Sequence, residues 1–248
     1  MEFSYIAFPH VNTSISFFRG VTVSRDNYEV VIEPNLIVPS PCCVEILGKY
    51  TQPVFVHYKG DFEEVAIVFK PFGVNQFLPC DLIKYVSKYS QPFSAKNWLQ
   101  FAPGLFREQN ETKRIEALEE FLLAIFQEIE NETISKSLEL LANADMDYSI
   151  ETIASICSMN VKTFQRQFLK HITCTPSEYK RIARFRFALQ TKILSREIKT
   201  LTDISYESNY YDQSYFIREF KKLTGLKPKK FFDAITVMDK KKIIWEIK

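Results

Sequence analysis

NYYDQSYFIREFKKLTG, at residues 209–225, and FQRQFLKHITCTPSEY, at residues 164–179, are two versions of one pattern. At an offset of 52 residues, the matching pairs are Phe164, Arg166, Phe168 and Lys170 with Phe216, Arg218, Phe220 and Lys222, and Pro176 and Tyr179 with Pro228 and Phe231. The stretch before each copy matches at an offset of 51, Ile153-Ala154 with Ile204-Ser205. Because a solenoid needs about three repeats, two copies fit a pair of helix-turn-helix units better.

The second helix of each unit has an apolar face and a polar face. The apolar face, which we expect to be core, holds Val161, Phe164 and Phe168 in the first unit and Phe216, Phe220 and Leu223 in the second. The candidate DNA-binding residues on the polar face are Lys162, Thr163, Gln165, Arg166 and Lys170 in the first unit and Gln213, Ser214, Ile217, Arg218 and Lys221 in the second. Arginine pairs with guanine and glutamine with adenine in the major groove, which the N-terminal half of a recognition helix reaches. The alternative is a solvated basic face, and the recurrence of the pattern in both copies favours base reading.

The helix that joins the two units has a length that suits DNA. Thr175-Pro176-Ser177-Glu178 is a capping box with proline at the first helical position, and the helix is expected to run to about Leu194. About 18 residues span roughly 27 Å, and successive major-groove faces lie roughly 34 Å apart. One chain could therefore place both recognition helices on one side of a duplex.

The C-terminal part resembles the AraC/XylS-type DNA-binding domain over residues 138 to 232, and IxxxxNYYDQSYFIREFKKLTGLKPKKF (204–231) is the most characteristic stretch. The resemblance implies a bacterial transcription regulator whose two helix-turn-helix units bind adjacent major-groove segments. By resemblance, the base-reading positions are Lys162, Gln165 and Arg166, and Gln213, Ser214, Ile217 and Arg218. Where the family has turn or exit glycines, this chain has Asn209, Ser158 and Thr173, which predicts strain or a changed turn type in the first unit.

The charge of the chain is divided unevenly. Residues 1–135 carry 11 Lys and Arg against 17 Asp and Glu, a net charge of −6, and residues 136–248 carry 21 against 13, a net charge of +8. A basic half favours a polyanionic partner, although charge also varies along ordinary chains.

The N-terminal half is expected to be β-rich up to about residue 70, because short runs of Val, Ile and Phe alternate with proline and glycine. Short helices are predicted at 81–88 and 94–101, capped by Asp81 and Ser94, and a longer helix at 110–130. The fold class is α+β and multidomain: a β-rich sensor or dimerisation domain with flanking helices at 1–132, an all-α double helix-turn-helix domain at 133–238, and a basic tail at 239–248. The tail could contact phosphate or pack on a domain, and the sequence leaves both open.

The predicted helix at 110–130 has an apolar stripe, formed by Ile115, Leu118, Leu122, Ile125 and Ile129. The stripe either packs on its own domain or forms the seam of a homodimer. A small-molecule effector pocket is the second hypothesis for this half, which is similar to an N-terminal domain of some AraC-type regulators. Its candidate residues are Glu45, His57, Tyr58 and Phe72, and the alternative is that they are ordinary strand and turn residues.

The sequence has no motif of an enzyme. The three histidines lack metal-ligand spacing, the five cysteines lack CxxC spacing, and no phosphate-binding glycine loop or nucleophile motif occurs. We therefore expect no catalytic residues, metal or cofactor. No apolar run suits a membrane span and no signal peptide begins the chain, so a cytoplasmic protein without a membrane partner is expected. The expected partners are double-stranded DNA, a small-molecule effector, RNA polymerase and a second copy of the chain. The alternative function is a helix-turn-helix module for protein interaction or nonspecific DNA binding, without effector control.

Overall fold

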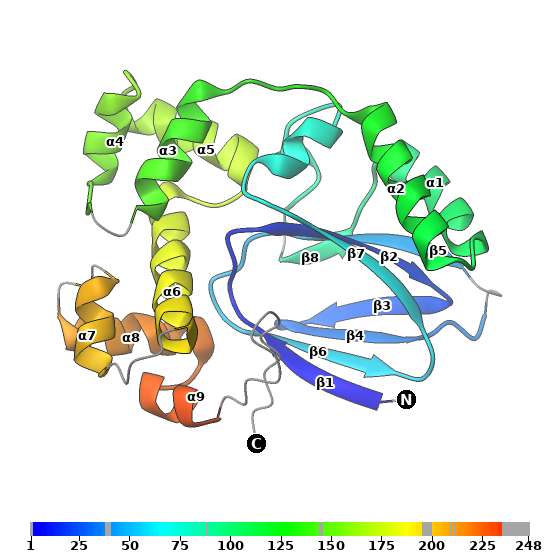
Figure 1. Ribbon diagram of the computed structural model, residues 1–248, viewed down its shortest axis with the longest axis horizontal. Helices are drawn as coiled ribbons and strands as arrows, with labels where there is room; N and C mark the ends of the chain where they lie inside the picture. The colour runs from blue at the N-terminus through cyan, green and yellow to red at the C-terminus, as the bar shows by residue number, and fades with distance from the viewer. Residues whose placement is uncertain are drawn as a thin grey trace.

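The computed structural model describes residues 2–37, 41–87, 89–143, 146–194, 200–208, 210 and 212–234. Figure 1 shows a sheet-rich part built from the first half of the chain beside an all-helical part built from the second half. This arrangement, with one long central helix in the helical part, confirms the predicted fold class. No helix in the described part of the chain is long and apolar enough to cross a membrane.

Two four-stranded sheets form the first part, in the orders β1-β6-β4-β3 and β7-β2-β5-β8. The strands are β1 (Glu2–Ala7), β2 (Thr13–Arg19), β3 (Val21–Asp26), β4 (Glu29–Pro34), β5 (Cys42–Leu47), β6 (Val54–Lys59), β7 (Glu63–Phe69) and β8 (Ser90–Pro92). Neighbouring strands are antiparallel, except that β4 and β6 are parallel. Because successive side chains of a strand point to opposite faces, Val54, Val56 and Tyr58 of β6 are buried between the sheets, with Phe18 and Ile32.

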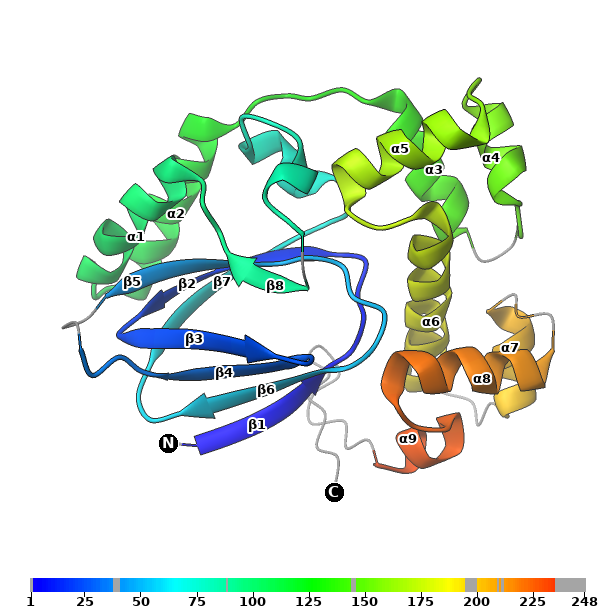
Figure 2. The ribbon, with the colours of Figure 1, turned by 180° about the vertical axis from the view of Figure 1, so that it is seen from behind.

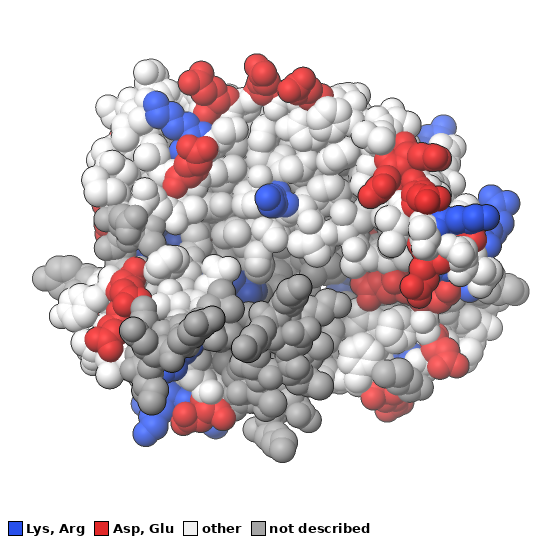
Figure 3. Space-filling view, in the orientation of Figure 1, with Lys and Arg blue, Asp and Glu red and all other residues white. Residues whose placement is uncertain are grey.

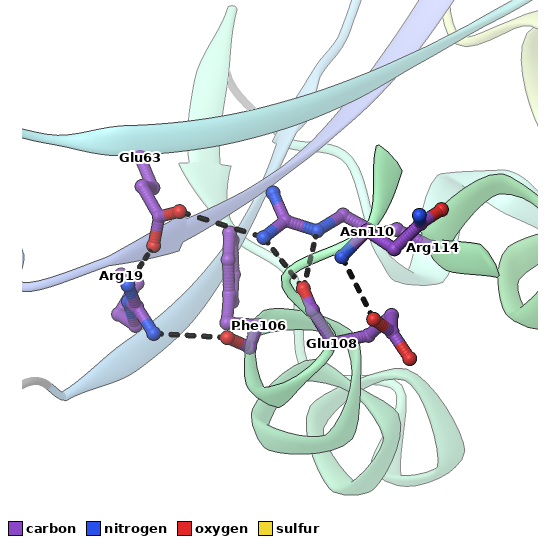
Figure 4. Close-up of polar contacts among 6 residues, drawn as sticks. All are labelled: Arg19, Glu63, Phe106, Glu108, Asn110 and Arg114. Carbon is purple, nitrogen blue, oxygen red and sulfur yellow. Dashed lines mark hydrogen bonds and ion pairs between the residues drawn. The ribbon is translucent and has the colours of Figure 1, made fainter. Parts of the chain in front are cut away.

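Two helices, α1 (Lys96–Arg107) and α2 (Glu111–Ile125), cover the outer face of the β7-β2-β5-β8 sheet. Their core is aromatic, and Trp98 stacks on Phe17 of β2 with ring centroids 5.8 Å apart. Charged side chains link the strands of this sheet to the two helices at one edge (Figure 4). Arg19 donates to the carbonyl of Phe106 at 2.9 Å and pairs with Glu63, which also lies 3.5 Å from Arg114 of α2.

Three details of this half differ from the predictions. The described residues 81–87 contain only the short 3-10 helix η2 (Leu82–Lys84), which Asp81 precedes without a hydrogen bond from its side chain. Ser94 caps no helix, because Ala95 is the N-cap of α1. Helix α2 begins after its cap Asn110, as the range 110–130 suggests, but ends at Ile125. Ile129 lies beyond the helix, where the side chain of Gln76 accepts from its N–H at 2.6 Å and donates to its carbonyl at 3.1 Å.

Seven helices build the second part within the described residues. They are α3 (Glu132–Ala142), α4 (Ile150–Ile156), α5 (Val161–Ile172), α6 (Pro176–Leu194), α7 (Leu201–Glu207), α8 (Gln213–Thr224) and α9 (Pro228–Ala234). Short polar side chains begin several of them: Ser149, Asn160 and Asp212 accept from the N–H of the third residue on, and Thr200-Asp203 forms a capping box. Thr175 and Glu178 form another at the start of α6. The tail 239–248 lies outside the described residues.

The turns of the first helix-turn-helix unit keep the backbone conformation that glycine normally provides. Ser158, between α4 and α5, has a φ of 55°, and Thr173, after α5, has a φ of 63°. In the second unit, Gly225 has a φ of 76° at the position that corresponds to Thr173, while Asn209 lies outside the described residues. The strain alternative of the prediction therefore fits, because a β-branched residue in the left-handed region is an outlier.

The two parts meet along α5, α6 and α9. Arg186 of α6 donates to the carbonyls of Phe8 and Pro9 at 2.6 Å each, and the ring of Phe8 meets the edge of Phe231 at 5.0 Å. At the other end of the contact, Asn75 donates to the carbonyl of His171 at 3.0 Å. The β-rich part thus contacts both helix-turn-helix units.

Candidate nucleic-acid interface

The two predicted recognition helices, α5 and α8, lie on the same side of α6 and cross it near its two ends (Figure 2). Each follows a short helix, α4 or α7, and packs its apolar face into a separate core. Phe164 and Phe168 are fully buried with α3 and α4, and Phe216 and Phe220 are fully buried with α6 and α9. The core residues predicted from the repeat are therefore the ones that hold the recognition helices in place.

On α5, the side chains of Lys162, Gln165 and Arg166 are exposed, and Thr163 is half-buried. Within the described part of the chain, no hydrogen bond or ion pair engages Lys162, Gln165 or Arg166, so all three are available to a ligand. Lys170 differs, because its ammonium lies 3.3 Å from Asp81 of the β-rich part and it sits in the last turn of the helix. Its position suits a contact that links the two parts better than contact with a base edge.

On α8, Gln213, Ser214, Arg218 and Lys221 are exposed. The Arg218 guanidinium lies 5.2 Å from the centre of the Tyr215 ring, a cation–π distance that limits its rotation. Ile217 is half-buried against the core of the second unit. An apolar residue in this place offers contact with a thymine methyl group.

Between the two units, the described residues form an open concavity of about 790 Å³ against α6. Basic side chains of α6, Lys180, Arg181 and Arg184, line it together with Arg218 and Lys222 of α8. These three residues of α6 are not among the DNA-binding candidates that the repeat predicts. Their spacing opposite the buried Ile182 and Phe185 would have revealed a basic stripe along that helix.

The residues that form both units match a known family. The family model described as "Helix-turn-helix domain" matches residues 153–234. The chain is also 28% identical, over 83 residues, to the HTH-type transcriptional activator RhaS from Enterobacter sp. (strain 638). Residues 153–234 therefore form a helix-turn-helix domain of the AraC/XylS type. The match with RhaS covers 34% of this chain and 29% of RhaS, so it spans less than a third of that relative.

Solved structures of regulators are also similar to the chain. A single-residue variant of apo ToxT from Vibrio cholerae is 15% identical, with a TM-score of 0.47, over 94% of this chain and 93% of that one. A DNA-binding transcriptional dual regulator from Escherichia coli K-12 is 18% identical, with a TM-score of 0.37, over 43% of this chain and 95% of that one.

In the β-rich part, a cavity of about 160 Å³ lies between the two sheets. Two of the four candidate effector residues line it: Glu45, which pairs with Arg25, and Tyr58, which donates to Glu64 at 2.7 Å. Burial raises the pKa of the Glu45 carboxyl, and the contact with Arg25 opposes that rise. His57 points to the other face of β6, toward Glu29 and Ser4, and Phe72 packs on His171 of the AraC/XylS-type domain. The structure therefore does not bring His57 and Phe72 into the cavity.

The candidate dimer stripe lies on α2, at the far side of the sheets from the AraC/XylS-type domain (Figure 1). Leu118, Leu122 and Ile125 pack on the core beneath α2, as the packing alternative predicts, and Ile129 follows the helix. Ile115 is 58% exposed and Leu123 is 76% exposed. In Figure 3, acidic side chains gather at the right over the β-rich part, with basic ones beside them, and acidic and basic side chains lie together at the lower left over the C-terminal helices.

Proposed function

We propose that the protein is a sequence-specific DNA-binding transcription regulator that reads adjacent major-groove segments with α5 and α8. The observation that carries the proposal is the pair of exposed polar faces: Gln165 and Arg166 on α5, and Gln213 and Arg218 on α8, with the two arginines at matching positions. Arginine and glutamine are the side chains that pair in bidentate fashion with guanine and adenine. Contact with RNA polymerase is part of the proposed role in transcription.

The spacing of the units supports two adjacent reading sites. Helix α6 has 19 residues, and at 1.5 Å per residue it is roughly 28 Å long. Successive major-groove faces on one side of B-DNA lie roughly 34 Å apart. Helices that cross α6 near its ends on one side thus suit two consecutive turns of the groove.

Selection of a random duplex library by the full-length protein, read by sequencing, tests the proposal. We expect two short enriched blocks whose centres lie about one helical turn apart. One enriched block would mean that only one unit reads bases. No enrichment, together with salt-sensitive binding, would replace the proposal with a nonspecific DNA-binding or protein-interaction module.

We propose that the β-rich part gates DNA binding through a small effector in the cavity between the sheets. The lining combines aliphatic side chains with a few polar groups, among them Glu45, Tyr58 and Ser16, as ligand pockets do. Its volume of about 160 Å³ lies below the range of roughly 300–1,000 Å³ usual for ligand pockets, so the effector would be small. A screen of small polar metabolites by thermal shift, repeated with Glu45→Gln, would reveal such a ligand, and an unchanged melting temperature throughout would count against gating by this cavity.

We propose a homodimer through α2 and predict that its seam is centred on Ile115 and Leu123. These exposed apolar side chains are available, whereas Leu118 and Leu122 already pack beneath the helix. Leu123→Glu should convert a micromolar dimer into a monomer in multi-angle light scattering, because it places a charge in the seam. Glu120→Gln, an exposed position on the same helix that lies off the line from Ile115 to Leu123, is the control. A wild-type protein that is monomeric at micromolar concentration would contradict the seam.

A further inference from the structure

The concavity between the two helix-turn-helix units has more hydrogen-bond donors than acceptors. Lys180 and Arg184, one turn apart on α6, face it with side chains that are 14% and 17% exposed. Beside them, the Nε of Arg181 lies 3.6 Å from Glu219, too far for a hydrogen bond. The buried hydroxyl of Tyr210 has no hydrogen-bond partner among the described residues. Donors that converge on an open hollow favour an anion as ligand.

Three carboxylates line this concavity, those of Asp147, Glu178 and Glu219. Asp147, in the segment that leads into α4, pairs with both Lys180 and Arg184. Partial burial alone would raise the pKa of the Asp147 carboxyl, but the bond from Lys180 and the charge of Arg184 lower it below the usual value. The Asp147 side chain remains 53% exposed, whereas its two cationic partners are mostly covered. The carboxylate is therefore the member of this cluster that a competing anion can replace.

The position of the cluster identifies that anion. It lies on α6 between the two recognition helices, next to Arg218 of α8, so a duplex read by α5 and α8 would pass its backbone over this hollow. The anions of such a backbone are phosphodiesters, and arginine and lysine are the side chains that bind them.

We propose that Asp147 holds, in the free protein, the place of a DNA backbone phosphate, and that a phosphodiester replaces it on Lys180 and Arg184 when DNA binds. The inference rests on the proposed function and adds an internal competitor to it. Because a surface ion pair contributes little, breaking it opposes DNA binding only weakly. The competitor acts on phosphate contacts, which carry no sequence information, so it weakens binding to every duplex by the same factor.

The test is a binding titration of the full-length protein with a random-sequence duplex of 30 base pairs and with the duplex enriched by selection. Asp147→Asn should tighten binding to both by roughly two- to five-fold, the range that a surface ion pair allows. Glu151→Gln is the matched control, because Glu151 is an exposed acid of α4 that pairs with neither cation. Equal tightening by both variants would reduce the effect to net charge and overturn the proposal.

The cations provide the second arm of the test. Lys180→Gln and Arg184→Gln should weaken binding to both duplexes and each lower the salt slope by about one. In the double variant Lys180→Gln, Arg184→Gln, the further change Asp147→Asn should no longer tighten binding, because the groups that it releases are gone. Undiminished tightening in that background would overturn the proposal. Melting temperatures of all variants establish that they remain folded.

The outcomes separate the two proposals. A wild-type protein that binds neither duplex would overturn the proposed function and this inference with it. A wild-type protein that binds both duplexes, with an Asp147→Asn variant that binds no more tightly, would overturn this inference alone.

Discussion

Arg218 and Arg166 occupy matching positions in the two units, but only Arg218 is described with an aromatic partner, the ring of Tyr215. A guanidinium whose orientation is limited before binding loses less side-chain entropy when it pairs with guanine. We therefore predict that Arg218→Ala weakens binding to the selected duplex by about 1–3 kcal/mol and relaxes preference at one base position. Arg218→Lys should not restore that preference, because lysine lacks the planar fork. Sequencing after selection by each variant provides the measurement.

The control at the residue scale is Lys221→Gln, on the same helix and exposed. Loss of a phosphate contact should weaken binding to all duplexes alike and leave the selected motif unchanged. A selected motif that is the same for Arg218→Ala as for the wild type would remove the base-reading role from Arg218.

At this scale, the sequence predicts which face of a helix or strand a side chain lies on, but not which distant residue it contacts. Helical spacing places Phe164 and Phe168 in the core and Gln165 and Arg166 outside it, and the structure agrees. Alternation along β6 separates His57 from Tyr58, a distinction that composition alone did not reveal. The pairing of Asp147 with Lys180 joins residues 33 positions apart, and no local periodicity encodes it.

At the scale of elements, the turn after α5 places a β-branched residue in the left-handed region of backbone conformation. Thr173 has a φ of 63°, and its buried hydroxyl has no hydrogen-bond partner among the described residues. A non-glycine residue held in the left-handed region typically costs about 1–3 kcal/mol. Thr173→Gly removes that strain and the unpaired hydroxyl, but adds entropy to the unfolded chain. We predict a net gain of ~1 kcal/mol in the free energy of unfolding, measured in urea.

Gly225 provides the reciprocal control, because it fills the corresponding place after α8 with a φ of 76°. A Cβ there would meet only Pro53, at an ordinary 3.9 Å, so Gly225→Ala reports backbone strain and little steric clash. It should destabilise the protein by ~1 kcal/mol. A Thr173→Gly variant that is less stable than the wild type would show that contacts of the threonine side chain outweigh its strain.

The sequence predicts those helix boundaries that depend on contacts between near neighbours in the chain. The caps Ser149, Asn160 and Asp212 were predictable because each acts on a backbone N–H within three residues. The end of α2 was not, because Gln76, far away in the chain, binds the backbone of Ile129 beyond the helix. Local rules give the starts of these helices, and a distant side chain sets this end.

At the scale of the whole molecule, the segment between β1 and β2 ties the β-rich part to the second helix-turn-helix unit. Phe8 packs among residues of α6, α8 and α9, and Arg186 binds the carbonyls of Phe8 and Pro9. The first unit is tied separately, through Asn75 and Asp81 to the end of α5. A rearrangement of the β-rich part would thus reach both recognition helices, which is the physical basis for the gating that we propose. None of these contacts has a signature in the sequence.

The same segment carries a titrating group that makes stability depend on pH. His10 accepts a hydrogen bond from the N–H of Asn12 at 2.9 Å, and burial, with the nearby charges of Arg186 and Lys49, lowers its pKa to about 3. Its pKa in the unfolded chain is about 6.5. Between these two pKa values the unfolded chain binds a proton that the folded protein does not. The free energy of unfolding is therefore highest above about pH 6.5 and falls as the pH drops below that value.

We therefore predict that wild-type protein loses ~1 kcal/mol of unfolding free energy between about pH 7.5 and about pH 5.5 through His10. His10→Asn retains an acceptor for the N–H of Asn12 but does not titrate, so the same change of pH should affect the variant less by about that amount. Urea unfolding of both proteins at the two pH values gives the comparison, in which the carboxylates common to both cancel. Equal losses would mean that His10 takes up a proton as readily in the folded protein as in the unfolded chain, and that the junction between the two parts does not exclude charge.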